Sequence, residues 1–402
     1  MRIFTGALYP YPDGSQTFFD REAGLLSRGF EALGIESGAI TLEPATSSDL
    51  PAMTRASRQQ LEDPRWWATM NLDGLILITW ANYDYRPVVK AAMQAGIRVA
   101  QVTDTQGISS PVADWSAHLQ AERAHYWFEP RWRQIVRTLA KLPITLTSRV
   151  IYRDLRDART IAASDYFLAP TPRAAERYKT FTRRLQGAKA AERVLFVPFP
   201  VNFHFEYSPG IAKLEEVVAV GRWDSHQKRT PLLMATISEA LKSRPTIRFR
   251  IFGQRSPELD QWHQQLPEHL RGQVVIEGLV PNNRVVEAYQ RARVILVSAA
   301  YEGCHNASAE AVCSGTSVVG CRSPFLGVLE WHASKNSGRL ADKETPESLT
   351  RALLDELESW DRGDRDPEAI SKAWTRELRA DRVAARILDL FAKLPARSRL
   401  KP

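Results

Sequence analysis

Two glutamates and the loop between them are the most informative group of residues in the sequence. Glu302 and Glu310 have seven residues between them and follow the apolar run 294–297, at the start of a small-residue helical pattern. Backbone N–H groups at the start of such a helix attract phosphate oxygens, and Gly303 lets a ligand approach the backbone closely. A carboxylate beside a diphosphate would repel it, so the glutamates should accept hydrogen bonds from neutral hydroxyls, such as those of a sugar. The stretch therefore predicts a site for a sugar carried on a diphosphate.

The same loop offers further candidate ligand contacts. Cys304, His305 and Asn306 lie within it, and we expect Asn306 to cap the helix. One carboxylate would then hold a ribose and the other a hexose. The residues alone leave a simpler interpretation open, in which Glu310 only complements the helix dipole and Glu302 is a solvated loop residue.

Short apolar runs rich in β-branched residues alternate with helical patterns along the chain. This alternation is typical of βαβ units and predicts parallel sheets. The segment FHFEYSPGIAKLEE, residues 203–216, interrupts the alternation and resembles a linker. Strands are expected at residues 2–4, 74–79, 98–102, 166–169, 194–197, 217–220, 249–252, 274–276, 294–297 and 318–319. Helices are expected at residues 17–33, 87–95, 172–180, 232–241, 284–291, 307–313, 346–360 and 367–391.

The linker divides the chain into two α/β domains. We expect two Rossmann-like, doubly wound domains that face a central cleft, because ligands of such sheets bind at the carboxyl ends of the strands. The first domain is placed at residues 1–208 and the second at residues 209–366. Residues 367–402 are expected to form a last helix that crosses back to the first domain.

The second half of the chain resembles a known family, the retaining glycosyltransferases of the GT-B fold, and in particular family 4. The resemblance covers roughly residues 217–354 in order and spacing. Members carry a strand, a Glu, seven residues, a second Glu, a small-residue helix and a strand similar to Gly-Thr-Pro-Val-Val. Here Glu302 and Glu310 have that spacing and SGTSVVG follows, with Ser317 where Pro is usual.

A basic loop upstream carries the next part of the resemblance. VVAVGRWDSHQKRTPLL is similar to the family's first strand of this domain, its Gly-Arg loop and its Lys-Gly segment. The match places Gly221 at the start of the loop, and Arg222 and Lys228 on the two phosphate-binding basic residues. The resemblance implies that these cations and the helix start at Asn306 stabilise the charge that develops on the departing nucleoside diphosphate.

The first half of the chain resembles the family only loosely. Its first strand is followed by YPYPDGSQTFFDREAGLL, where the family has a Gly-Gly turn that faces the diphosphate. Gly14 fits one of these glycines, and Asp13 occupies the place of the other. Asp104 stands where many members have a His near the reacting sugar. The resemblance implies that this domain binds the acceptor and that the second domain binds the donor.

The resemblance implies a specific reaction. A hexose would move from a nucleotide-diphosphate sugar to an acceptor hydroxyl with retention at the anomeric carbon, without a metal or a further cofactor. Arg222, Lys228 and Glu302 would carry catalysis, with Glu302 on the donor sugar and Glu310 on the ribose. No protein nucleophile is named, because attack by the acceptor on the same face is the usual proposal for such enzymes.

Other functions also remain open. A nucleotide-sugar epimerase or a sugar phosphorylase would have the same fold. A basic protein that binds anionic lipid or nucleic acid, with a vestigial sugar site, belongs to a different class.

Residues 123–159 hold most of the excess positive charge of the chain. They contain nine Lys or Arg against three acids, a net charge of +6, whereas the whole chain has 54 against 46 and a net charge of +8. Large apolar residues are interleaved with these charges, as in segments that lie on an anionic membrane or hold a phosphorylated acceptor. Arg131 and Arg133 are the candidate contacts on this acceptor side. The interpretation we prefer is an amphipathic helix that packs its aromatics inward and solvates its arginines.

Composition and absent motifs exclude several classes of protein. With 44% hydrophobic and 25% charged residues, the chain has a globular composition. Three cysteines, Cys304, Cys313 and Cys321, lack zinc-ligand spacing and are expected to be reduced. The one Asp-x-Asp, residues 364–366, lies in a charged turn pattern, so no metal site is expected. The sequence has no P-loop and no dinucleotide-binding fingerprint.

The sequence also predicts where the protein is located and which partners it has. No apolar run approaches the ~20 residues that cross a bilayer, and the start of the chain has no signal-peptide pattern. We expect a cytoplasmic protein, with peripheral contact to the inner membrane surface as an additional expectation. A nucleotide sugar is the expected donor, and a glycan, a glycolipid or a small molecule is the expected acceptor. Nucleic acid is not an expected partner, because no nucleic-acid-binding motif is present.

Overall fold

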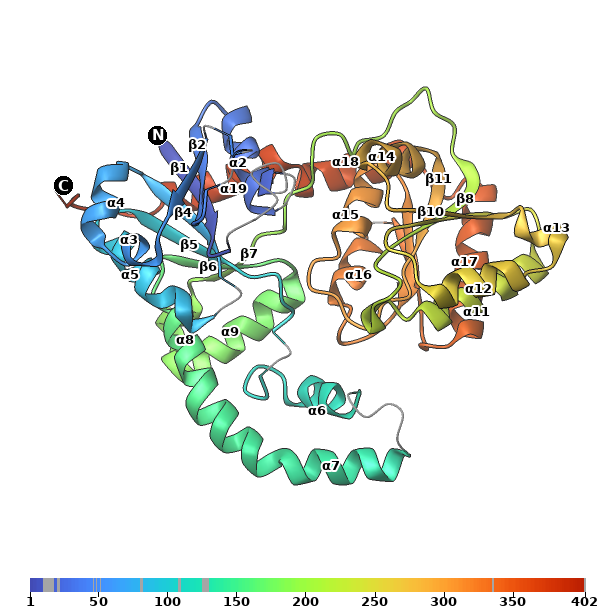
Figure 1. Ribbon diagram of the computed structural model, residues 1–402, viewed down its shortest axis with the longest axis horizontal. Coiled ribbons are helices and arrows are strands. Elements are labelled where there is room, and N and C mark those ends of the chain that lie inside the picture. The colour runs from blue at the N-terminus through green and yellow to red at the C-terminus, as the bar shows by residue number, and fades with distance from the viewer. Residues whose placement is uncertain are drawn as a thin grey trace. The chain divides into compact units, whose positions relative to one another are not determined.

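The computed structural model describes most of the chain (Figure 1). The described residues are 1–9, 18–19, 22–45, 47, 49–50, 52–79, 82–107, 110–124, 130–334 and 336–400.

The chain forms two compact units. The first unit consists of Met1–Pro200 together with Ala380–Pro402, and the second unit is Val201–Arg379. The chain therefore passes between the units at residues 200/201 and 379/380, whereas the sequence placed the boundaries at 208/209 and 366/367.

A seven-stranded parallel sheet forms the centre of the first unit, in the order β3-β2-β1-β4-β5-β6-β7. Its strands are β1 (Arg2–Ala7), β2 (Glu36–Leu42), β3 (Met53–Ala56), β4 (Gly74–Ile78), β5 (Arg98–Val102), β6 (Tyr166–Ala169) and β7 (Val194–Phe196). Its helices are α2 (Glu22–Ala32), α3 (Arg58–Leu61), α4 (Pro64–Met70), η1 (Tyr83–Tyr85), α5 (Arg86–Gln94), α6 (Trp115–Ala124), α7 (Arg131–Ile144), η2 (Thr145–Asp154), α8 (Leu155–Ile161), α9 (Pro172–Gln186), α10 (Ala188–Ala191) and α19 (Ala380–Ala392).

A six-stranded parallel sheet forms the centre of the second unit, in the order β10-β9-β8-β11-β12-β13. Its strands are β8 (Leu214–Val220), β9 (Arg248–Phe252), β10 (Val274–Gly278), β11 (Ala292–Leu296), β12 (Ser317–Cys321) and β13 (Gly338–Ala341). Its helices are η3 (His226–Lys228), α11 (Thr230–Ser243), α12 (Pro257–Gln265), α13 (Glu268–Arg271), α14 (Asn282–Arg291), α15 (Asn306–Cys313), α16 (Gly327–His332), α17 (Pro346–Asp361) and α18 (Pro367–Leu378).

Both sheets reverse their strand order at the middle. In the second unit the chain runs outward from β8 to β9 and β10, and then returns to place β11 on the other side of β8. In the first unit the same reversal lies between β1 and β4. The loops that leave two such neighbouring strands diverge, which opens a crevice for ligands at the carboxyl edge of the sheet. The expected doubly wound α/β class is therefore confirmed for each unit.

Local signals explain where many helices begin. Several helices start with a capping side chain that accepts a backbone N–H, followed by a proline at the first helical position. Such pairs are Asp63-Pro64, Thr171-Pro172, Ser256-Pro257, Thr345-Pro346 and Asp366-Pro367. The capping side chain accepts one of the free backbone N–H groups at the start of the helix, and the proline has no N–H that needs a partner. The local sequence alone therefore stabilises the start of each of these helices.

The last helical pattern, expected as one helix over residues 367–391, is two helices. Arg379 has extended backbone angles and separates α18 from α19. In the second unit, α18 is held by Ser371, whose Oγ donates to the Cys313 carbonyl at 2.5 Å, and by Trp374, whose Nε1 donates to Ser337 Oγ at 2.9 Å. In the first unit, α19 packs against α2, where the Ala380 carbonyl fills the space that a side chain at Gly29 would need.

The basic segment is helical where it is described, but it does not pack its apolar side chains inward. The helices α7, η2 and α8 follow one another from Arg131 to Ile161. Trp132 is 61% exposed and Leu139 is 56% exposed. The preferred interpretation, an amphipathic helix with buried aromatics, is therefore wrong for the described part of this segment. None of the helices described here is both long enough and apolar enough to span a lipid bilayer.

Candidate functional site

The two loops predicted to hold the site meet at the reversal point of the second sheet. The loop after β8 contains Lys228, and the loop after β11 contains Glu302. Backbone and side-chain hydrogen bonds join the two loops. Ala300 N donates to the Gln227 carbonyl at 2.8 Å, and Gln227 Nε2 donates to the Tyr301 carbonyl at 2.9 Å. The loops are thus fixed to each other at the carboxyl edge of neighbouring strands.

Lys228 and Glu302 form an ion pair at this point. Lys228 Nζ donates to Glu302 Oε1 at 2.6 Å, and the side chains are only 15% and 9% exposed. Burial raises the pKa of Glu302, while the charges of Lys228 and Arg222 act in the opposite direction. The Lys228 carbonyl also accepts a hydrogen bond from Ser298 Oγ at 2.6 Å. Two residues that the sequence predicted for one site therefore touch each other, although 74 positions separate them.

The backbone around the basic loop is closely packed. Gly253, at the end of β9, has φ +106°, and a Cβ there would overlap the Gly221 carbonyl oxygen. Arg229 precedes α11 in the left-handed conformation with φ 46°, so it occupies the N-cap position and Thr230 is the first helical residue. Arg222 is exposed at the start of the loop. Of the two predicted cations, Lys228 is thus held inside the site and Arg222 lies at its surface.

The cap of α15 differs from the expectation. His305, and not Asn306, is the N-cap residue, with φ 36° and ψ 70°. Its Nδ1 accepts the Ser308 N–H at 3.2 Å, while Asn306 is exposed as the first helical residue. Burial lowers the pKa of His305 far below its ordinary value, and the charges of Lys228 and His332 lower it further. The neutral ring can therefore accept this bond.

A buried network that the sequence did not reveal supports this cap. His332 Nδ1 lies 2.7 Å from Ser308 Oγ, which itself donates to the His305 carbonyl at 3.0 Å. Burial lowers the pKa of His332 to about 3, so the ring is neutral and shares a single hydrogen bond with the Ser308 hydroxyl. The ring of Trp374 packs edge-on against it at 5.3 Å. His332 lies outside every motif, and only the packing of α16 against α15 brings it to the loop.

The remaining predicted donor-side residues lie along the same loop and helix. Gly303 and Cys304 are half-buried in the loop, and Glu310 is half-buried on α15. Burial raises the pKa values of Tyr289 and Cys313, and the charge of Glu310 raises them further. Glu310 therefore lies near Tyr289 of α14 and Cys313 of α15.

The other predicted residues belong to the first unit. Asp104 is half-buried in the loop after β5, and its charge contributes to a raised pKa of Tyr178, which is due mainly to burial. Arg131 and Arg133 are exposed at the start of α7. Gly14 lies outside the described residues. In the described part of the chain, no cluster of His, Cys, Asp and Glu is arranged to hold a metal ion.

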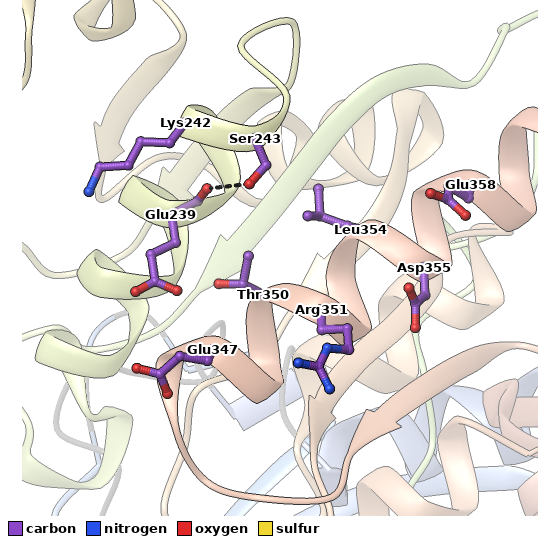
Figure 2. Close-up of a pocket in the computed structure, with 9 residues that line it drawn as sticks. All are labelled: Glu239, Lys242, Ser243, Glu347, Thr350, Arg351, Leu354, Asp355 and Glu358. Atoms are coloured by element: carbon purple, nitrogen blue, oxygen red, sulfur yellow. Dashed lines mark hydrogen bonds between the residues drawn. The ribbon is translucent and has the colours of Figure 1, made fainter.

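A groove between α11 and α17 is a separate feature of the second unit (Figure 2). It has a volume of about 590 Å³ and contains none of the predicted site residues. Its charged lining has four acids and two bases, namely Glu239, Glu347, Asp355, Glu358, Lys242 and Arg351. This balance does not suit an anionic ligand, so the candidate site stays at the edge of the sheet.

A protein-family model matches part of the second unit. Residues 215–359 match a protein-family model described as glycosyl transferases group 1. The match begins in β8 and ends in α17, so it includes both loops of the candidate site. No curated protein matches the chain in sequence.

Solved structures resemble the whole chain. Sucrose-phosphate synthase from Thermosynechococcus elongatus superposes with a TM-score of 0.61 at 14% identity, covering 98% of each chain. Anabaena Alr3699/HepE, solved in complex with UDP, gives a TM-score of 0.62 at 11% identity, covering 98% of this chain and 100% of that one. The lipopolysaccharide outer core galactosyltransferase WaaB gives 0.60 at 14% identity with the same coverage. The fold is therefore that of GT-B glycosyltransferases, with two Rossmann-like units.

Proposed function

We propose that this chain is a retaining GT-B glycosyltransferase that moves a hexose from a nucleotide-diphosphate sugar to an acceptor hydroxyl. The observation that carries the proposal is the buried pair of Lys228 and Glu302 at the reversal point of the second sheet. Ligands of such sheets bind there, and the pair offers a cation for a phosphate beside a carboxylate for a hydroxyl. The match of residues 215–359 to a glycosyltransferase family model supports the same conclusion.

The cations act on the leaving group. When the bond between the anomeric carbon and the diphosphate oxygen breaks, its electron pair stays on that oxygen. Lys228 and Arg222 stabilise this charge, and Lys228 is already positioned because Glu302 and the Ser298 hydroxyl hold it.

The carboxylates bind the neutral parts of the donor. Glu302 accepts hydrogen bonds from hydroxyls of the transferred sugar, and Glu310 accepts them from the ribose. His305 and the loop residues Gly303 and Cys304 shape the wall between them. Because Ser308 N and Ala309 N already bond to His305, the phosphate contacts belong to residues that precede them in the chain.

Retention and independence of metal complete the proposed mechanism. The acceptor oxygen attacks from the face that the diphosphate leaves, and the acceptor proton passes to the departing phosphate oxygen, so no protein nucleophile is assigned. Two protein cations take the part that a divalent ion has in other transferases, and no cofactor is proposed besides the nucleotide-sugar donor and the acceptor. The first unit binds the acceptor, with Asp104 as a residue proposed to line that side, and Gly14 is proposed to face the diphosphate of the donor.

Incubation with a panel of UDP, GDP, ADP and dTDP sugars tests the proposal. The panel starts with UDP sugars, because HepE was solved with UDP and with UDP-glucose. A transferase releases nucleoside diphosphate, at least slowly to water, and retains the anomeric configuration in the glycoside it forms. An epimerase leaves the diphosphate linked, a phosphorylase consumes a sugar phosphate, and a binding protein changes no donor. Any of these last three outcomes would overturn the proposal.

Thermal shift with the free diphosphates identifies the base before an acceptor is known. A ligand that binds only the folded state stabilises it by about 2.7 kcal/mol at a concentration of 100 Kd. The diphosphate with the largest shift names the donor series for the activity assay.

A further inference from the structure

The helix α7 carries large apolar side chains on an exposed face. Trp132 is 61% exposed, Val136 56% and Leu139 56%. These residues are spaced by four and three positions, so they lie on one side of the helix. Thr138, on another side, is 4% exposed and marks the face that packs inward. The apolar stripe is therefore turned away from the body of the first unit.

A basic stripe runs beside the apolar one. Arg133, Arg137 and Lys141 are spaced by four residues each, so they follow a second line along α7. The guanidinium of Arg133 lies 5.1 Å from the centre of the Trp132 ring. Residues 131–153 contain six Lys or Arg and no Asp or Glu. The stretch is thus amphipathic and cationic without any acid of its own.

The exposed apolar surface continues into η2. Ile144, the last residue of α7, is 65% exposed, and Ile151 and Tyr152 of η2 are 62% and 67% exposed. In Figure 1 the green helical segment from α8 through α7 arches away from the sheet of the first unit. Together, α7 and η2 present an elongated surface of aliphatic, aromatic and basic side chains.

The acids described next to this surface are buried or paired. Asp154 is buried and accepts a hydrogen bond from Ser110 Oγ at 2.6 Å. Asp157 pairs with Arg153 at 3.6 Å, and Glu122 of α6 pairs with Lys141 at 3.6 Å. Asp154 and the pair of Lys141 with Glu122 thus attach the segment to other parts of the first unit, and residues 131–153 themselves carry only positive charge.

We propose that α7 and η2 form a docking surface for an anionic phospholipid bilayer. A helix with a basic face and exposed Trp and Leu lies in the plane of the interface, where apolar side chains enter the acyl region and basic ones meet lipid phosphates. A second copy of this surface would bring like charges together, and a nucleic acid would leave the aliphatic side chains in water. This proposal is independent of the transfer reaction.

Flotation with lipid vesicles tests the proposal on the full chain. Vesicles of phosphatidylcholine with phosphatidylglycerol should bind the protein, and vesicles of phosphatidylcholine alone should not. Binding should weaken as salt rises, because the attraction is screened. With each basic residue near the surface contributing about 1 kcal/mol, R131E/R133E/R137E should weaken binding by more than about a hundredfold. W132S/L139S should also weaken it, since the apolar stripe is needed.

Matched controls separate this surface from general charge. The variant K189E/K242E/K372E reverses three exposed lysines elsewhere and should keep vesicle binding within a few fold. Both triple variants should bind the nucleoside diphosphate as the wild type does, which shows that they are folded. Equal binding to both vesicle types, no binding to either, or equal losses in the two triple variants would overturn the proposal. So would self-association that R131E/R133E/R137E abolishes in the absence of vesicle binding.

Discussion

The loop that holds Lys228 and the helix α7 are both rich in cations, but they surround those cations differently. Lys228 is 15% exposed and its ammonium bonds to a buried carboxylate. The cations of α7 lie on the surface, along a stretch of 23 residues, 131–153, without an acid. A buried, paired cation is oriented for one small ligand, whereas a row of exposed cations can meet a large, flat, anionic partner. The burial and pairing of the cations, more than their charge, therefore distinguish a site for a small ligand from a surface for a large anionic partner.

The largest expected effect belongs to the buried cation. K228M should lower kcat by about a hundred- to a thousandfold, because loss of one preorganised contact to a developing charge costs ~2.7 to 4 kcal/mol. R222A should have an effect of the same kind. Rates at saturating donor measure it, with K242A, an exposed lysine of the same unit, as the control. A near wild-type kcat in either variant would remove that residue from the mechanism.

Removal of Lys228 also leaves a buried carboxylate without its cation, so stability must be separated from chemistry. K228M should be destabilised, and K228M/E302Q should recover much of that loss because the buried charge is gone. Neither should recover activity. Urea unfolding of the three proteins gives the comparison, and recovery of kcat in the double variant would contradict the role of Lys228.

The next effect concerns the two carboxylates. E310A should weaken binding of the free nucleoside diphosphate by roughly ten- to a hundredfold, because a hydrogen bond to a charged group contributes about 1.5–3 kcal/mol. E302Q should leave that affinity nearly unchanged and impair transfer, since it acts on the sugar. Calorimetric titration with the diphosphate and donor turnover measure the two quantities. Equal losses of diphosphate affinity would refute this division.

A smaller effect is expected at the base of the exposed segment. Burial is the main cause that raises the pKa of Asp157 from 3.8 to about 6, and nearby arginines only partly oppose it. Between about pH 4 and 6 the folded protein then binds more protons than the unfolded one, so the free energy of unfolding falls as pH rises through this range. A full shift would be worth ~3 kcal/mol, and solvent screening at this partly exposed group reduces it to about 1 kcal/mol.

The variant D157N tests this pH dependence. It should flatten the fall in stability between pH 4 and 6 by about 1 kcal/mol relative to the wild type. Urea midpoints at a series of pH values provide the measurement. A wild-type slope in D157N would assign the pH dependence to other groups.

The smallest expected effect is that of a chelator. Because two protein cations are proposed to stabilise the leaving group, turnover should be unchanged in EDTA. Loss of activity that Mg²⁺ or Mn²⁺ restores would show that the pair formed by Arg222 and Lys228 is not sufficient.

Much of the sheet architecture was predictable because strong local signals specify it. The apolar runs that became β1, β8 and β11 are buried on both faces, so they are continuous and easily recognised. The strands β2, β3 and β13 were missed. Their sequences, ESGAITL, MTRA and GRLA, mix polar and small residues, and only pairing with a neighbouring strand defines them.

The sequence by itself determined the identity and spacing of the residues proposed for the site. Glu302, Glu310 and Lys228 lie in short motifs whose glycines and helix starts can be recognised locally. Only the tertiary structure decided that Lys228 bonds to Glu302, since their contact depends on β8 and β11 being neighbours in the sheet. It also decided that His305 caps α15. For α7, an apolar stripe has the same helical period whether it faces a core or solvent, so the sequence could not choose between the two. The packing of Thr138 inward, with Trp132 and Leu139 outward, made that choice.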